Sequence, residues 1–280
     1  MKFDPSSAPK PTVISASAPP TQKFDPSAVR NKFAAKQAEE IHVLNRPLGP
    51  MPQWSFSRLM DFEKCPYGVY LTKIGKCPSP SGPAAERGTQ VHDHIEKFIR
   101  GEHADYTKEL NSFRSLFERL RDGFSEARVE VEGDWGFTRD WRVTGWTSPD
   151  TWARVKLDAI EFESETSANV YDWKTGKKFG NEMKHGQQAM TYSIAAFKRY
   201  PQLEFITAKM IYVDKNEELP STYTRAQAEL LFPRLNLRAN QMTTATKFPA
   251  NPSIHNCRWC PHAKQQEGLE APACNYRYEA

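Results

Sequence analysis

Apolar residues recur at helical spacing in several segments of the chain. The clearest stripe is Val91, Ile95, Phe98 and Ile99, which predicts an amphipathic helix packed on a core. Ser55 or Ser57 can cap an earlier helix, because a serine hydroxyl accepts a hydrogen bond from a free amide of the first turn. The expected helices span residues 55 to 70, 84 to 99, 106 to 124, 183 to 199 and 225 to 244.

Other segments alternate between apolar and polar residues or are continuously apolar, as strands are. The expected strands span residues 128–132, 142–147, 153–162, 169–173 and 205–213. The order along the chain is therefore helices, a meander of strands, a helix, a strand and a last helix. This order predicts an α/β fold with a mixed central sheet flanked by helices.

Residues 1–52 differ in composition from the rest of the chain. They are rich in Pro, Ser, Ala and Lys and show little apolar periodicity, so we expect a disordered tail before a single folded domain at 53–280. The pentapeptide Lys-Phe-Asp-Pro-Ser occurs at residues 2–6 and again at 23–27. It is either a two-copy docking motif for a partner or a chance repeat.

Composition excludes few classes of function. The chain has 280 residues, of which 39% are hydrophobic, and a formal net charge of +4, which permits a polyanionic partner without requiring one. No segment approaches the roughly 18 consecutive apolar residues of a membrane span, and the N-terminus lacks the apolar core of a signal peptide. We therefore expect a soluble, intracellular protein.

Candidate chemistry first appears at two neighbouring predicted strands. Asp158 lies near the end of one, and Asp172 and Lys174 close the next. Two carboxylates on adjacent strands can hold Mg²⁺ against a phosphate, and a lysine two positions on shares the strand face of Asp172. An Asp-x-Lys triplet on its own is common, and an exposed strand end is its ordinary interpretation.

Three polar residues on predicted helices accompany these carboxylates. His92 lies beside an apolar position of its helix, and Gln188 and Tyr192 are four residues apart on one helix face. Taken singly, each fits an ordinary solvated helix surface. The chain has no Gly-x-x-x-x-Gly-Lys-Ser/Thr phosphate loop, so it is not itself a helicase.

In this order, the residues resemble the RecB-like branch of the PD-(D/E)XK nuclease superfamily. The resemblance implies that His92, Asp158, Asp172 and the main-chain carbonyl of Trp173 bind the catalytic metal. It also implies that Lys174 positions the attacking water and that Gln188 and Tyr192 support the site or the DNA backbone. The family commonly has a glycine three residues before this aspartate, whereas this chain has Val155 there. Glu163 and Glu165 are therefore alternative candidates for the role of Asp158. Glu130 or Glu132 is a candidate for an auxiliary acidic position.

The five cysteines suggest a second metal site, because clustered thiols in a reducing compartment are more often metal ligands than disulfides. Cys257 and Cys260 have the spacing of a metal-binding hairpin. With Cys65 and Cys274, they resemble the iron–sulfur members of this branch, including the CRISPR adaptation nucleases and the AddB subunit. This resemblance implies a structural [4Fe–4S] cluster held by these four cysteines. A Zn²⁺ site with Cys77 or His262 as substitute ligands is the alternative.

The resemblance implies a deoxyribonuclease that depends on Mg²⁺ or Mn²⁺ and trims DNA ends in recombination, repair or replication. The expected setting is the cytoplasm of a bacterium or a phage-infected host. A structure-dependent endonuclease and a non-catalytic DNA-binding scaffold are the alternatives. Unwinding would come from a partner, and a helicase or single-strand-binding protein could dock on the N-terminal tail.

Overall fold

The computed structural model describes residues 26–265 and 271–278. The chain divides into two units, residues 1–41 and 42–280. The first copy of the repeated pentapeptide and residues 23–25 of the second lie outside the described residues. Within the described ranges, no helix combines the length and the apolar character needed to span a membrane.

Helix α1 (Pro26–Asn45) lies inside the segment that we expected to be disordered. Its residues include Ala, Lys, Gln and Glu at most positions after Phe33, and these residues have high intrinsic helix propensity. Pro26 occupies the start of the helix, where its missing amide costs nothing. The prediction of a structureless segment across 1–52 therefore differs from the structure at Pro26–Asn45, because helix propensity favours a helix there even without apolar periodicity.

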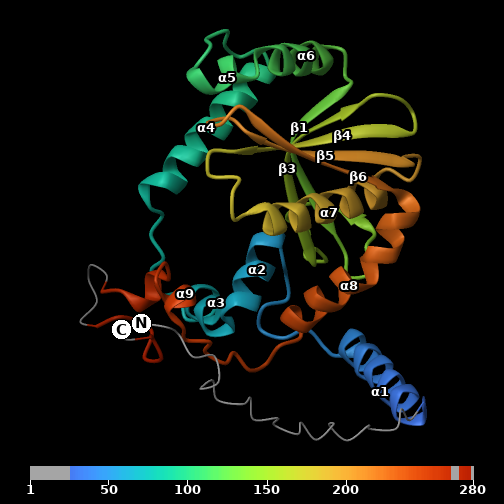
Figure 1. The fold of residues 1–280 in the computed structure, drawn as a ribbon, viewed down its shortest axis with the longest axis vertical. Helices are drawn as coiled ribbons and strands as arrows, with labels where there is room; N and C mark the ends of the chain where they lie inside the picture. Colours follow the sequence, from blue (N-terminus) through green and yellow to red (C-terminus); the bar gives the residue numbers. More distant parts are fainter. Residues whose placement is uncertain (1–25, 266–270, 279–280) are drawn as a thin grey trace, which may run out of the picture. The chain divides into compact units, whose positions relative to one another are not determined.

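Six strands form one mixed sheet in the order β2-β1-β3-β4-β5-β6. Figure 1 shows the sheet, with β1, β3, β4, β5 and β6 labelled. The strands are β1 (Val129–Phe137), β2 (Val143–Thr144), β3 (Ala153–Phe162), β4 (Ser167–Lys174), β5 (Phe205–Tyr212) and β6 (Glu217–Thr224). Only β4 and β5 pair in parallel, and helix α7 (Glu182–Arg199) connects them. The expected mixed sheet is confirmed, whereas β6 was not predicted and β1 extends beyond the expected strand.

The remaining helices are α2 (Phe56–Lys64), α3 (Pro66–Lys73), α4 (Pro83–Ile99), α5 (Lys108–Ser112), α6 (Arg114–Ser125), α8 (Arg225–Thr243) and α9 (Ile254–Cys257). Two expected helices are each split. The first breaks at Cys65, because the residue before Pro66 is disfavoured in helical conformation. The other breaks at Phe113, whose φ of −132° and ψ of 40° are not helical.

Helices cover both faces of the sheet (Figure 1). One apolar cluster joins β3, β4 and β5 to α7 and α8. The other joins β1, β4 and β5 to α4 and α6, with Phe117 against Trp173 at 5.2 Å between ring centroids. Strand β4 therefore lies between two layers of helices, and both of its faces are packed against apolar side chains.

Removing the Phe117 ring tests this packing. Phe117 is fully buried, so Phe117→Ala leaves a cavity and is expected to destabilise the protein by about 3–5 kcal/mol in urea unfolding. Phe179→Ala is the matched control, because the Phe179 side chain is 89% exposed and should change stability by less than about 0.5 kcal/mol. Equal effects of the two substitutions would contradict the packing described here.

Candidate active site

The two candidate carboxylates meet where strands β3 and β4 separate. The β3–β4 pairing ends at Ala159 opposite Tyr171, and beyond it the Asp158 carboxylate takes the place of a ladder partner. Its Oδ2 accepts a hydrogen bond from the main-chain amide of Trp173 at 2.6 Å. Asp158 and Asp172 are only 8% and 4% exposed. Two acidic groups are therefore buried side by side at the end of β4.

Helix α4 supplies the candidate histidine. His92 Nδ1 lies 3.1 Å from Asp158 Oδ1. Burial lowers the pKa of His92, but the hydrogen bond and negative charge of Asp158 outweigh burial and leave this pKa above its usual value. The imidazole and the carboxylate thus stabilise each other's charged forms.

Helix α7 holds the second carboxylate from one face. Asp172 Oδ1 accepts hydrogen bonds from Tyr192 Oη at 2.8 Å and from Gln188 Nε2 at 3.1 Å. The Lys174 ammonium contacts Asp172 Oδ2 and donates to Gln188 Oε1 at 2.9 Å. One amide side chain therefore connects the lysine to the carboxylate, and the i, i+4 spacing on α7 directs Gln188 and Tyr192 to the same point.

The structure thus brings all six residues of the predicted catalytic set together. His92 and Asp158 form one pair, and Asp172, Lys174, Gln188 and Tyr192 form a hydrogen-bonded group beside it. The substitutes proposed for Asp158 lie elsewhere. Glu163 accepts a hydrogen bond from Asn169 at 2.5 Å near the β3–β4 turn, and Glu165 is exposed in that turn.

The electrostatics of the site favour a bound cation. Burial raises the pKa of Asp158, and the charge of Asp172 raises it further, against the opposing hydrogen bond from His92. Two buried carboxylates repel each other, and a divalent cation between them would reverse that repulsion. Carboxylate oxygens are the ligands that Mg²⁺ and Mn²⁺ prefer, so the donor set fits these ions.

Three of the four carboxylate oxygens of Asp158 and Asp172 have hydrogen-bond partners, whereas Asp172 Oδ2 is buried without one and is contacted by the Lys174 ammonium. Across the described part of the chain, no three His, Cys, Asp or Glu side chains are grouped closely enough to hold a metal ion.

Glu132 lies next to the site. The sequence alone did not distinguish Glu132 from Glu130 as the auxiliary acidic residue. The β1–β3 register places Glu132 across from Asp158, between the pairs Val131–Ala159 and Gly133–Leu157. Burial raises the pKa of Glu132, and Asp158 is among the charges that raise it further, against the opposing contact with Lys156. Glu130 instead accepts a hydrogen bond from Tyr200. A glycine directly after an acidic strand residue was the available signal, because it is typical of a bulge.

Sequence reasoning missed His185, which lies one turn before Gln188 on α7. Its Nδ1 lies 2.6 Å from the Tyr212 hydroxyl. Burial and the positive charge of Lys174 lower the pKa of His185 to about 4, so the ring is neutral at pH 7. The i, i+3 spacing to Gln188 was the available signal.

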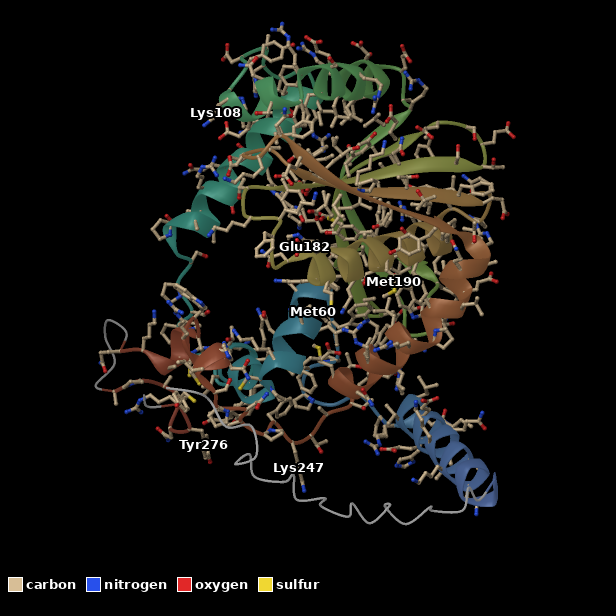
Figure 2. The ribbon with its side chains drawn as sticks, in the orientation of Figure 1. Met60, Lys108, Glu182, Met190, Lys247 and Tyr276 are labelled. Carbon is tan, nitrogen blue, oxygen red and sulfur yellow. The ribbon has the colours of Figure 1, made fainter. Side chains whose placement is uncertain are left out.

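The four predicted cysteine ligands line one small cavity of about 20 Å³. Cys65 lies between α2 and α3, and the other three lie in the C-terminal segment. Main-chain amides donate to two of the sulfur atoms, Asn251 N to Cys65 Sγ at 3.5 Å and Tyr278 N to Cys257 Sγ at 3.4 Å. Figure 2 shows Tyr276, another residue of this lining, far from Lys108 of α5.

Several observations bear on metal binding at this cavity. Burial raises the pKa of the Cys274 thiol, and the nearby thiols of Cys260, Cys65 and Cys257 raise it further. His262 also lines the cavity, whereas Cys77 does not. His262 is buried, with Nε2 2.8 Å from Thr72 Oγ1. The cysteines are free thiols. Among the described residues, no three cysteine, histidine or acidic side chains are grouped closely enough here to hold a metal ion.

Comparison with known proteins gives a family match. The sequence profile of the PD-(D/E)XK nuclease superfamily matches residues 53–265, about three quarters of the chain. The matched range includes all six residues of the candidate active site and ends before Cys274. No curated protein matched the chain.

Three solved structures are similar to the chain at low identity. The crystal structure of SSO0001 is 14% identical, with a TM-score of 0.42 over 83% of this chain and 93% of that one. A putative exonuclease from Eubacterium rectale is 14% identical, with a TM-score of 0.43 over 86% and 94%. An alkaline exonuclease from Laribacter hongkongensis is 9% identical, with a TM-score of 0.36 over 69% and 88%. Scores below 0.5 do not establish a common fold.

Proposed function

The chain belongs to the PD-(D/E)XK nuclease superfamily, and we propose that it is a divalent-metal-dependent deoxyribonuclease. The observation that carries this proposal is the buried pair Asp158 and Asp172 with the Lys174 ammonium against it. A binding protein has no chemical need for a lysine beside two buried carboxylates. We further propose an exonuclease that trims DNA ends in recombination, repair or replication.

Each residue of the site has a role in this proposal. His92, Asp158, Asp172 and the Trp173 carbonyl would hold Mg²⁺ or Mn²⁺, which would neutralise charge on the scissile phosphate. Lys174 orients the attacking water and stabilises negative charge as it develops. Gln188 and Tyr192 fix the positions of Asp172 and Lys174 through the hydrogen bonds described above.

We infer that Cys65, Cys257, Cys260 and Cys274 bind a [4Fe–4S] cluster with a structural role. The support is their common cavity and the amide hydrogen bonds to two of their sulfur atoms, since such bonds stabilise metal-bound thiolates. A brown protein with broad absorption near ~400 nm is the outcome expected for iron–thiolate chemistry. A colourless protein with stoichiometric zinc would assign the site to zinc.

The setting of the activity is also part of the proposal. DNA is the substrate, and Lys177 and Lys178 beside the site would follow its phosphate backbone. A helicase or single-strand-binding protein would dock on residues 1–52. The protein would act in the cytoplasm of a bacterium or a phage-infected host.

Metal binding by site variants tests the assignment of ligands. Asp172→Asn should weaken Mn²⁺ binding, measured by calorimetry, by at least about tenfold, because a charged oxygen ligand is lost. Glu163→Gln removes a carboxylate outside the site and should leave the affinity unchanged. Equal affinity of Asp172→Asn and the wild type for Mn²⁺ would contradict metal binding at this site.

Cleavage of linear and of closed circular DNA distinguishes an exonuclease from an endonuclease. With Mg²⁺ or Mn²⁺, an exonuclease degrades linear DNA and spares a closed circle. Nicking of the circle would favour the endonuclease alternative. DNA binding without cleavage of either form would favour the non-catalytic scaffold.

A further inference from the structure

Two adjoining cavities lead away from the candidate active site. The smaller, of about 250 Å³, is lined by Gln188 and Tyr192 of the site. The larger, of about 370 Å³, lies between α2, α3 and the C-terminal cysteine segment. Ser55 and Ser57 line both cavities, so the two meet at the start of α2. We call the pair the α2 channel.

Positive side chains line both parts of the α2 channel. Arg154 and Lys156 line the smaller cavity, and Arg58, Lys64 and Lys73 line the larger. One acidic residue, Asp61, also lies in the larger lining. Lys156 pairs with Glu132, but the other four cations outnumber Asp61, so the balance of charge in the described lining is positive and suits a ligand with repeated negative charges.

Two arginines at the junction lack a carboxylate partner. Neither Arg58 nor Arg154 forms an ion pair with any residue that the structure describes, and Arg58 Nε is buried without a hydrogen-bond partner. Burial lowers the pKa of Arg58, and the nearby positive charge of Arg154 lowers it further. Arg58 lines the larger cavity, Arg154 lines the smaller, and Ser55 and Ser57 line both, so together they form a cationic site that a phosphate would neutralise.

An exposed aromatic ring also lines the larger cavity. Trp259 lines this cavity and is 73% exposed. The guanidinium of Arg258 lies 5.2 Å and the ammonium of Lys264 5.7 Å from its ring centroid. An exposed tryptophan flanked by cations is suited to stack on an unpaired base while the cations meet phosphates.

We propose that the α2 channel binds a single strand of DNA on its way to the active site. Arg58, Arg154 and the two serine hydroxyls bind a backbone phosphate, and Trp259 stacks on a base further along the strand. A duplex does not offer the faces of its internal bases to a protein ring, because they are stacked on their neighbours. This inference names the substrate of the proposed nuclease and so rests on that proposed function.

Binding measured without cleavage tests the phosphate contacts. Fluorescence anisotropy of a labelled single strand is measured on the full chain in chelator, where hydrolysis is not required. Arg58→Gln and Arg154→Gln should each raise Kd about five- to tenfold near 0.1 M salt and reduce the salt slope by about 0.7. Arg128→Gln is the control, because this half-exposed arginine pairs with Glu126 and lines neither cavity.

The stacking contact has its own pair of variants. Trp259→Ala should raise Kd for the single strand at least about fivefold, and Trp259→Phe should restore most of the affinity. Because Trp259 is adjacent to Cys260, metal content and thermal unfolding are measured on both variants. A loss of affinity that accompanies loss of metal is assigned to the cysteine site and counts against stacking.

The outcomes separate this inference from the proposed function. If all the variants bind like the wild type, or if duplex competes as well as a single strand, the channel assignment is wrong even when the protein cleaves DNA. If the variants lose binding but the wild type cleaves no DNA with any metal, the channel stands and the nuclease proposal fails.

Discussion

Lys174→Ala is expected to lower the rate of DNA cleavage by about two to four orders of magnitude while leaving folding intact. The Lys174 ammonium is the one cation that contacts Asp172 among the described residues, and it reaches Gln188 on α7 as well. In the proposed function, its removal takes away the group that orients water and stabilises developing charge. The measurement is the single-turnover cleavage of end-labelled DNA, with affinity measured separately in chelator.

Two controls make this result specific. Lys108→Ala removes the same charge from an exposed position on α5, which Figure 2 shows well away from Glu182 and Met190 of α7, and it should cleave like the wild type. Lys174→Arg keeps the charge but changes its shape, so it should recover little activity. Full activity of Lys174→Ala would contradict a catalytic role of this lysine.

Cys65→Ser is expected to release the metal and to lower the thermal stability of the protein strongly. Cys65 lies about 190 residues before Cys257, so a metal that joins them closes a very long loop and fixes both ends of the domain. The readouts are metal analysis, absorption near ~400 nm and thermal unfolding.

Cys77→Ser is the matched control, because Cys77 does not line the cysteine cavity. It should keep the metal and the unfolding temperature of the wild type. Metal loss in Cys77→Ser, with retention in Cys65→Ser, would show that the ligand set is the one considered for the zinc alternative.

Much of the candidate site could be predicted because its residues follow local rules. Asp172 and Lys174 are two residues apart and therefore share one face of their strand. Gln188 and Tyr192 are four residues apart and therefore share one face of their helix. The closeness of Asp158 and Asp172 follows from the pairing of consecutive strands. His92 lies 66 residues from Asp158 along the chain, and only the resemblance to a known family linked the two.

Other features depend on tertiary packing, which the local sequence pattern does not reveal. Strand β6 alternates weakly and contains Pro220, yet it pairs along β5 because an edge strand tolerates a proline. Glu132 adopts a φ of 52°, a bulge conformation that strand alternation does not predict. The α2 channel joins Arg58 to Arg154, which are distant in sequence, so tertiary packing alone brings them together.

The most direct test of the account is the cleavage of end-labelled single- and double-stranded DNA by the purified full chain, with Mg²⁺, with Mn²⁺ and with chelator. The account predicts shortening of the DNA in the two metal reactions and intact DNA in the chelator. No shortening with either metal, from folded protein that binds DNA, would contradict the assignment of a nuclease.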